Sequence, residues 1–368
     1  MLNSELSEPV VSALRPLCSE LAALNGGQDD PQQLASVLER SPITRLLVPT
    51  GAGGLGGNWL DLISSAATVA HASGSAAWLV SHYALNAALV GRFTESVQQQ
   101  VWGSPTSWVA QTQSAPTAVC RLAADHVVVN GEWRLVTGAA HAKWVLLQAS
   151  GPDTGEVVVL VPRPALEAAD LDSLGGLRGV GLQHLIAREV EVPAIQMIPR
   201  ERLFATPPEG IVVDADGLSG SGEPYWLNAQ LGSVLGCAEG GYEEYRRITS
   251  QSIGGVAGNK VAELTQVQIR LARTRTELKT AGLLVTDMIG RVGRDSAELL
   301  AGERSYVARL CLDSVARLVQ QMGARGLFDT NPLQRRYRDL RAMIAHDVFD
   351  WRHNTAQLGR LELGVSDG

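Results

Sequence analysis

Hydrophobic and polar positions follow a helical spacing at both ends of the chain and an alternating spacing in its middle. Residues 8–40 place apolar side chains at helical spacing, and Asp29-Asp30-Pro31 predicts the start of a second helix. Residues 60–90 are mostly apolar, rich in Ala and Ser, and predict one long buried helix. From about 105 to 200 the spacing changes to the alternation of strands. Helical spacing then returns over approximate spans 225–251, 259–292, 296–325 and 332–358.

This order predicts an α+β protein with an N-terminal helical domain over residues 1–104, a central antiparallel β domain over 105–215 and a C-terminal four-helix bundle over 216–368. No helices alternate with the strands, which excludes a doubly wound nucleotide-binding fold. The stretch from Gly51 to Gly57 formally contains GxGxxG. The strand before it is very short, however, and no carboxylate stands near the ribose-binding position. We therefore predict a loop between helices there.

The stretch from residue 127 to 147 has the most distinctive pattern of the β region. Three valines run into Asn130-Gly131, a dipeptide typical of hairpin turns, and a strand resumes at Trp133. Gly138-Ala139-Ala140 then leaves the backbone almost bare beside Thr137. Two interpretations stay open: Thr137 is simply exposed on a hairpin, or its hydroxyl donates to a flat heteroaromatic ligand.

Histidines on the apolar helices are the candidate chemical groups. Trp78 and His82 lie on one face of the helix predicted over residues 60–90, and His82 is either a satisfied core residue or part of a pocket. His346, Asp350 and His353 have the spacing i, i+4, i+7, which imitates a metal site. Three ligands spread over two turns of one straight helix rarely converge on one ion, so we predict no metal.

Composition narrows the class of protein. The chain has 368 residues, 45% hydrophobic and 19% charged, which is typical of a globular protein of two or three modules. A net charge of −7 without a long basic run argues against nucleic-acid binding. The four cysteines form no CxxC pair, the N-terminus lacks a signal-peptide pattern, and no apolar run is long enough to span a bilayer. We therefore expect a cytoplasmic protein with reduced thiols and no membrane partner.

Four stretches, in this order, resemble motifs of the acyl-CoA dehydrogenase superfamily over about residues 10–358. They are Val48-Pro49 before the Gly-rich loop, 130–138 (NGEWRLVTG), 174–193 from LGGLRG to VEVP, and 321–339 from QMGARG to RRYRD. The resemblance implies a β domain between two helical domains and a flavin cofactor.

Two chemistries compete within this superfamily. Residues 109–116 (VAQTQSAP) depart from the dehydrogenase motif, whereas GSAAW with His82, TG before HAKW, and RDLR before Ala345-His346-Asp347 resemble the two-component, group D monooxygenases. The resemblance implies a reduced-flavin-dependent monooxygenase that oxygenates a small organic substrate through a flavin C4a-hydroperoxide. The alternatives are an acyl-CoA or acyl-carrier dehydrogenase with Asp347 as base, and a scaffold without catalysis.

The resemblance also assigns roles to residues. Thr137 is expected to bond flavin N5, and His346, on the last helix, and His82 are expected to act on the substrate together with Trp78 and Asp347. The expected cofactor-binding residues are Trp108, Gln111, Gln113, Ser114, Thr137, Gly138 and Arg246, the arginine reaching a neighbouring subunit's flavin phosphate. Arg338-Asp339 is expected to be a structural ion pair.

Three further components follow from the same resemblance. Reduced FMN or FAD is the expected cofactor, and dioxygen the expected co-substrate. A separate NAD(P)H-flavin reductase is the expected partner, and the expected assembly is a homotetramer or a homodimer.

Overall fold

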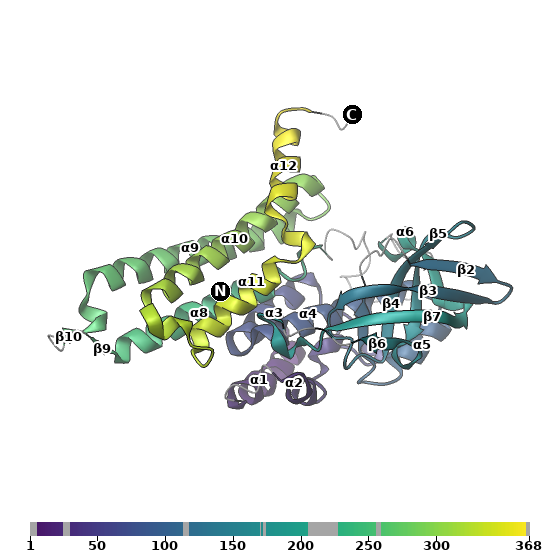
Figure 1. Ribbon diagram of the computed structural model, residues 1–368, viewed down its shortest axis with the longest axis horizontal. Helices are drawn as coiled ribbons and strands as arrows, with labels where there is room; N and C mark the ends of the chain where they lie inside the picture. Colours follow the sequence, from purple (N-terminus) through teal and green to yellow (C-terminus); the bar gives the residue numbers. More distant parts are fainter. Residues whose placement is uncertain are drawn as a thin grey trace.

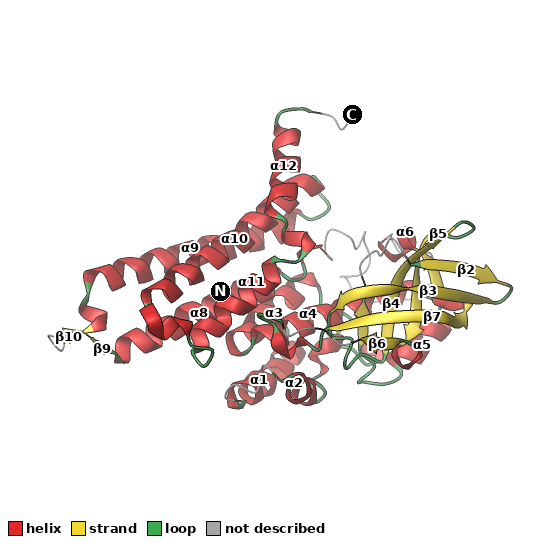
Figure 2. Ribbon diagram, in the orientation of Figure 1, coloured by secondary structure: helices red, strands yellow, loops and turns green. Residues whose placement is uncertain are grey.

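The computed structural model describes residues 6–24, 30–112, 118–169, 171, 174–204, 227–254 and 259–365. Most of its helices gather at one end of the molecule and its sheet lies at the other, as Figure 1 and Figure 2 show. The predicted α+β class is therefore confirmed, with strands from the middle of the chain and helices on either side of them in sequence.

The N-terminal part is helical. It comprises α1 (Glu8–Ala23), α2 (Pro31–Leu38), α3 (Trp59–Ala72), α4 (Gly74–Leu89) and α5 (Glu95–Trp102). Asp30 caps α2 as predicted, because its carboxylate accepts from the backbone N–H groups of Gln32 and Gln33. The prediction of one long helix over residues 60–90 is wrong. Ser73 has an extended backbone between α3 and α4, and its hydroxyl accepts from the Ala76 N–H to start α4 anew.

Eight strands form the sheet, in the order β6-β7-β3-β2-β4-β5-β8, with β1 paired to β4. They are β1 (Val109–Gln111), β2 (Val119–Ala123), β3 (His126–Val136), β4 (Trp144–Gly151), β5 (Gly155–Pro162), β6 (Glu167–Ala169), β7 (Gln183–Pro193) and β8 (Met197–Pro199). The sheet is mixed, not purely antiparallel as predicted, since β4 runs parallel to both β1 and β2. A short helix, α6 (Arg200–Phe204), follows β8.

The predicted hairpin at Asn130-Gly131 is absent. β3 continues through both residues, and its pairing register with β7 shifts there because of a bulge. The Asn130 side chain bonds the backbone N–H and the carboxylate of Glu189 across that bulge. The tight turn lies earlier, at Ala124-Asp125 between β2 and β3, where Ala124 has a φ of 54°. Asn-Gly therefore marks a local irregularity of the strand and not its end.

The C-terminal part contains α8 (Leu231–Gln251), α9 (Thr265–Arg291), α10 (Ala297–Gln321), α11 (Pro332–Ile344) and α12 (Trp351–Glu362). The first three long spans agree with the sequence prediction. The last predicted helix is interrupted by a 3₁₀ turn, η10 (Asp347–Phe349), after which α12 projects from the bundle (Figure 1). The tiny strands β9 (Ile253–Gly254) and β10 (Asn259–Lys260) connect α8 to α9.

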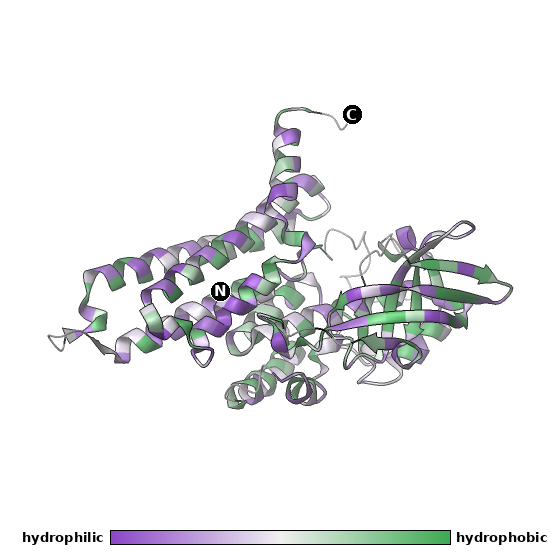
Figure 3. Ribbon diagram, viewed as in Figure 1, coloured by the Kyte–Doolittle hydropathy of each residue, from purple (hydrophilic) through white to green (hydrophobic). Residues whose placement is uncertain are grey.

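Three apolar cores hold these parts together. One extends through the N-terminal helices and the bundle, and the other two lie on opposite faces of the sheet. The alternation along β4 shows the division, since Val145 belongs to one face and Leu146 to the other. Hydrophobic segments accordingly dominate the inner strands, whereas polar and apolar segments alternate along α9 and α10 (Figure 3). In the described part of the chain, no helix is long and apolar enough to cross a membrane.

Candidate functional site

Three rings from two distant parts of the chain meet beside one cavity. Trp78 and His82, both on α4, have ring centroids 5.0 Å apart. The His346 ring lies 5.9 Å from the Trp78 ring and 6.3 Å from the His82 ring. The structure thus brings together two histidines that are 264 positions apart in the chain, from His82 to His346.

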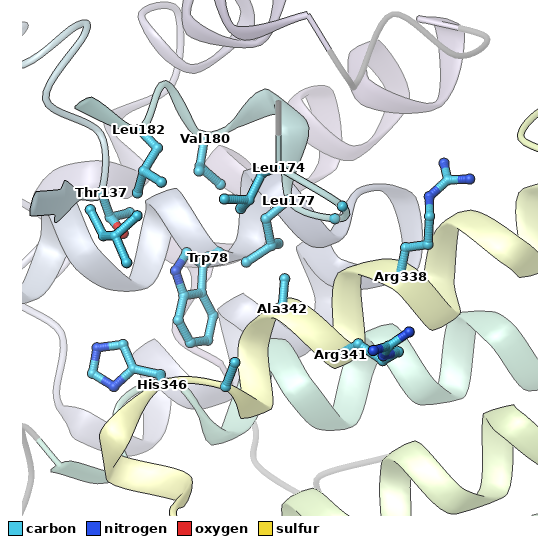
Figure 4. Close-up of a pocket in the computed structure, with 14 residues that line it drawn as sticks. Trp78, Thr137, Leu174, Leu177, Val180, Leu182, Arg338, Arg341, Ala342 and His346 are labelled. Atoms are coloured by element: carbon cyan, nitrogen blue, oxygen red, sulfur yellow. The ribbon is translucent and has the colours of Figure 1, made fainter. Parts of the chain in front are cut away.

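The cavity between the sheet, α4 and α11 has a volume of about 420 Å³. Thr137 and His346 lie at one end, and Arg338 and Arg341 lie at the other (Figure 4). Apolar side chains make most of the wall between these ends: Trp78, Leu135, Leu174, Leu177, Val180, Leu182, Ala342 and Ala345. The volume falls in the range of about 300–1,000 Å³ found for pockets that enclose small organic ligands.

The His82 ring has a defined tautomer. Its Nδ1 lies 2.8 Å from the Trp78 carbonyl oxygen, which can only accept, so Nδ1 carries the proton and Nε2 is left as an acceptor. Burial, and to a smaller degree His346, lowers the pKa of His82 to about 4, although the Trp78 carbonyl opposes the shift. His82 is therefore neutral at neutral pH and available as a proton acceptor.

Acidification is expected to destabilise the fold through His82. Its pKa in the folded protein is about 4, below the ordinary value of 6.5, so the unfolded chain binds more protons between these values and stability falls as the pH drops through them. Urea-unfolding midpoints at pH 7 and pH 5 should differ less for His82→Gln than for the unchanged protein. The exposed residue His353 provides the control, since His353→Gln should keep the full difference. An equal pH response in all three proteins would contradict the assignment.

The sequence predicted His346 on the last helix, which is wrong. The structure places it at the N-cap of the 3₁₀ turn η10. Its Nδ1 accepts from the Val348 N–H at 3.4 Å, which leaves the proton of the neutral ring on Nε2. Burial lowers the pKa of His346, the neighbouring Asp347 raises it and the Arg304 guanidinium lowers it. The neutral rings of His82 and His346 therefore present complementary Nε2 atoms, one an acceptor and one a donor.

Asp347 does not face this cavity. It is exposed, and it lines a second hollow of about 270 Å³ with Arg309 and Trp351. The extended backbone of His346, with φ −71° and ψ 138°, breaks the helical path and directs these adjacent side chains differently. Of the two residues only His346 lines the Trp78 cavity, and it also borders the second hollow. Asp347, expected in the substrate site, does not line that cavity.

The backbone beside Thr137 is fixed by a tyrosine that sequence reasoning missed. Tyr83 donates its hydroxyl to the Gly138 carbonyl at 2.7 Å, and the Gly138 N–H donates to the Val180 carbonyl at 3.0 Å. Both backbone groups of Gly138 are thus bonded within the chain, which fixes the backbone next to Thr137. The Thr137 hydroxyl lines the cavity, and no hydrogen bond of that hydroxyl to a described residue is found.

The other predicted cofactor residues are scattered. Trp108 is buried, donates its indole N–H to Thr44 at 3.1 Å and stacks on Tyr83, so in this chain it packs between α4 and the start of the sheet. Gln111 ends β1 and is half-buried. Arg246 is exposed on α8 and pairs with Glu243 at 2.5 Å. Gln113 and Ser114 lie outside the described residues.

Arg338 and Asp339 have structural roles, but they do not pair with one another as expected. Arg338 bonds Asp329 at 2.6 Å, whereas the Asp339 carboxylate accepts from the Leu177 N–H at 2.7 Å. The second contact ties the loop before β7 to α11 and so closes one wall of the cavity. No group of three His, Cys, Asp or Glu side chains suited to a metal ion occurs among the described residues.

Sequence reasoning missed most of the cavity wall. Leu135 and Leu177 both line it with left-handed backbones, at φ 58° and 53°, which are unfavourable for leucine. The signal available in the sequence was Gly175-Gly176, a pair of glycines before Leu177. It indicated a turn there but not what the turn encloses.

Comparisons with known proteins agree with this architecture. The family profile described as acyl-CoA dehydrogenase, C-terminal domain, matches residues 230–351. The oxygenase subunit HsaA of a flavin-dependent monooxygenase from Rhodococcus jostii is 24% identical over 380 residues, 97% of each chain. The predicted resemblance to the acyl-CoA dehydrogenase superfamily is therefore confirmed.

One further sequence relative and one solved structure are similar to this chain over most of its length. The oxygenase component of FADH(2)-dependent resorcinol hydroxylase from a Rhizobium species is 23% identical, with 87% of this chain and 84% of the relative aligned. The structure of XiaF from a Streptomyces species, in complex with FADH2 and glycerol, superposes with a TM-score of 0.84 at 18% identity, covering 98% of this chain and 95% of that one. That structural likeness shows the superfamily fold. The sequence relatives are oxygenase components of flavin-dependent hydroxylases.

Proposed function

We propose that this protein is the oxygenase component of a two-component, reduced-flavin-dependent monooxygenase. The observation that carries the proposal is the placement of His346 and the Thr137 hydroxyl at one end of an apolar cavity, with the His82 ring packed beside His346. Its relationship over nearly the whole chain to oxygenase subunits supports the same function. Asp347, the base that a dehydrogenase would need, faces a different hollow.

The residues present fit a flavin. Thr137 offers a hydroxyl next to the short side chains of Ala139 and Ala140, so a flat ring system can approach the backbone there, and we assign Thr137 to hold flavin N5. Reduced FMN or FAD would supply the electrons and, with dioxygen, the oxygen atom that is transferred. The overall reaction balances as substrate, dioxygen and reduced flavin giving hydroxylated substrate, water and oxidised flavin.

We further propose a hydroxylated aromatic ring as the substrate. Its hydroxyl would donate to Nε2 of His82 and accept from Nε2–H of His346, matching the fixed tautomers of both rings. A hydrogen bond from the phenol to the neutral imidazole of His82 raises the electron density of the ring where oxygen is to be added. The apolar wall, including Trp78 and Leu177, would exclude water from the reacting atoms.

The assembly and the partner belong to the same proposal. A separate NAD(P)H-flavin reductase would deliver the reduced flavin. A homotetramer or homodimer is supported by apolar side chains that lie exposed on the bundle, among them Ile269 and Leu283 on α9 and Leu361 on α12. Arg246 on α8 would then reach the flavin phosphate of a neighbouring subunit. Free thiols at all four cysteines support a cytoplasmic location.

Rapid mixing of reduced flavin, dioxygen and the protein tests the function. The expected result is a spectrum that differs from those of reduced and oxidised flavin, appears only with the protein and decays faster when a phenol is present. Hydroxylated phenol should then be recovered. Immediate reoxidation with stoichiometric hydrogen peroxide, unchanged by the protein, would contradict the proposal. Reduction of oxidised flavin by an acyl-CoA without a reductase would instead indicate a dehydrogenase.

A further inference from the structure

A buried arginine lies directly behind His346. Arg304 on α10 is 3% exposed, although arginine is among the residues that are almost never fully buried unless paired. Its Nε donates to the Val348 carbonyl at 2.7 Å and its Nη1 donates to the Asn228 amide oxygen at 3.3 Å. Both recorded partners are neutral. Burial lowers the pKa of Arg304 only to about 10, so the guanidinium stays charged at neutral pH.

The backbone of Val348 makes three hydrogen bonds with side chains. Its carbonyl also accepts from the Asn354 amide on α12 at 3.0 Å, and the same amide donates to Ser305 at 2.8 Å. The Val348 N–H donates to Nδ1 of His346. Side chains from α10 and α12 therefore hold the carbonyl of Val348, while the N–H of the same residue donates to the imidazole that faces the cavity.

We propose that Arg304 is the positioning residue for His346. It fixes the backbone of Val348 at its carbonyl, and the N–H of Val348 in turn holds the His346 ring toward Trp78 and His82 with its proton on Nε2. Only the expected effect on catalysis rests on the proposed function, because these hydrogen bonds are present in the protein without flavin. A planar guanidinium suits the task, since its donors lie in a fixed fork while a lysine ammonium is a flexible point charge.

Arg304 also acts on the charge of His346. The charged groups that act on the pKa of His346 are Arg304 from α10 and Asp347 from its own turn, and the His82 ring from α4 lies beside it. Arg309 and Asp350 line the second hollow, and Arg309 pairs there with the exposed Asp313. Asp347 favours the protonated imidazole, whereas Arg304 and burial oppose it. Loss of the Arg304 charge should therefore move the protonation of His346 to higher pH.

The test combines three variants with one matched control. Arg304→Met removes both the charge and the bond, Arg304→Lys keeps the charge without the fork, and Asn354→Ala removes the second donor to Val348 without a charge change. Arg309→Met is the control, because Arg309 lies on the same helix, carries the same charge and pairs with the exposed Asp313. Far-ultraviolet circular dichroism and thermal melts verify the fold of each protein.

Titration of the imidazole nitrogens by NMR in flavin-free protein is the first measurement, with the His346 signal assigned by its absence from His346→Gln. The midpoint should rise in Arg304→Met and stay low in Arg304→Lys, Asn354→Ala and Arg309→Met. If the His346 ring titrates with the same midpoint in Arg304→Met and Arg309→Met, the proposed effect of the Arg304 charge on His346 is wrong. This readout does not depend on oxygen transfer, so it distinguishes a wrong inference from a wrong function.

Oxygen transfer is the second measurement. A displacement of a reacting group by about 1 Å can cost about 100-fold in rate, and we expect a loss of that order in Arg304→Met and a smaller loss in Arg304→Lys and Asn354→Ala. The acid limb of the rate against pH should also move to higher pH in Arg304→Met alone. Rates equal to the Arg309→Met control in all three variants would overturn the positioning role.

Discussion

His346→Ala is expected to reduce the rate of oxygen transfer by about 10²–10⁴-fold, the usual contribution of a general acid–base group. The imidazole is the only side chain removed, and Thr137 on the opposite element remains in place, so the dissociation constant for reduced flavin should change little. Stopped-flow rates of product formation and a flavin titration measure the two quantities separately.

Asp347→Ala provides the comparison for this experiment. Asp347 neighbours His346 in the chain, but its exposed side chain lines a different hollow, so oxygen transfer should remain close to that of the unchanged protein. The acid limb should move slightly to lower pH, because Asp347 raises the pKa of His346. If Asp347→Ala lost the activity and His346→Ala kept it, the orientation of this turn would be wrong and a dehydrogenase base at Asp347 would gain support.

Gly176→Ala is expected to destabilise the protein by about 3 kcal/mol, at the upper end of the usual cost of overpacking. A Cβ atom on Gly176 would lie 2.1 Å from the Arg338 carbonyl oxygen, a backbone atom of α11 that cannot swing away. The loop must therefore move, which also strains the bond between the Leu177 N–H and Asp339. We expect the melting temperature to fall by about 5 °C, on the scaling of unfolding entropy with chain length.

The adjacent glycine gives a matched control. A Cβ atom on Gly175 meets nothing within 4 Å, so Gly175→Ala should melt close to the unchanged protein. The same loop contributes Leu177 and Val180 to the cavity wall. Its displacement in Gly176→Ala should therefore also raise the KM for an aromatic substrate. Equal melting temperatures for the two variants would show that the loop and α11 are not packed as closely as the structure indicates.

The periodicity of the chain determined much of the architecture before any coordinates were known. Apolar spacing along residues 259–292 and 296–325 predicted α9 and α10 well, since long amphipathic helices are specified by their own sequence. The change to strand-like spacing over about residues 105–200 likewise predicted where the sheet lies in the chain. The errors lie where one local signal had several structural outcomes: Asn130-Gly131 forms a bulge, and Ser73 separates two helices in a stretch where serine is common.

The residues of the site were likewise predicted from the sequence only in part. Sequence by itself determined that Trp78 and His82 share a helical face, because that is local geometry, and motif resemblance indicated Thr137 and His346. Only the tertiary structure decided that His346 and not Asp347 enters the cavity, because a 3₁₀ turn replaces the expected helix and redirects both side chains. It also assigned Arg304, Tyr83 and Leu177 their places. Contacts between elements far apart in the chain depend on how those elements pack, and no periodicity within one element records that packing.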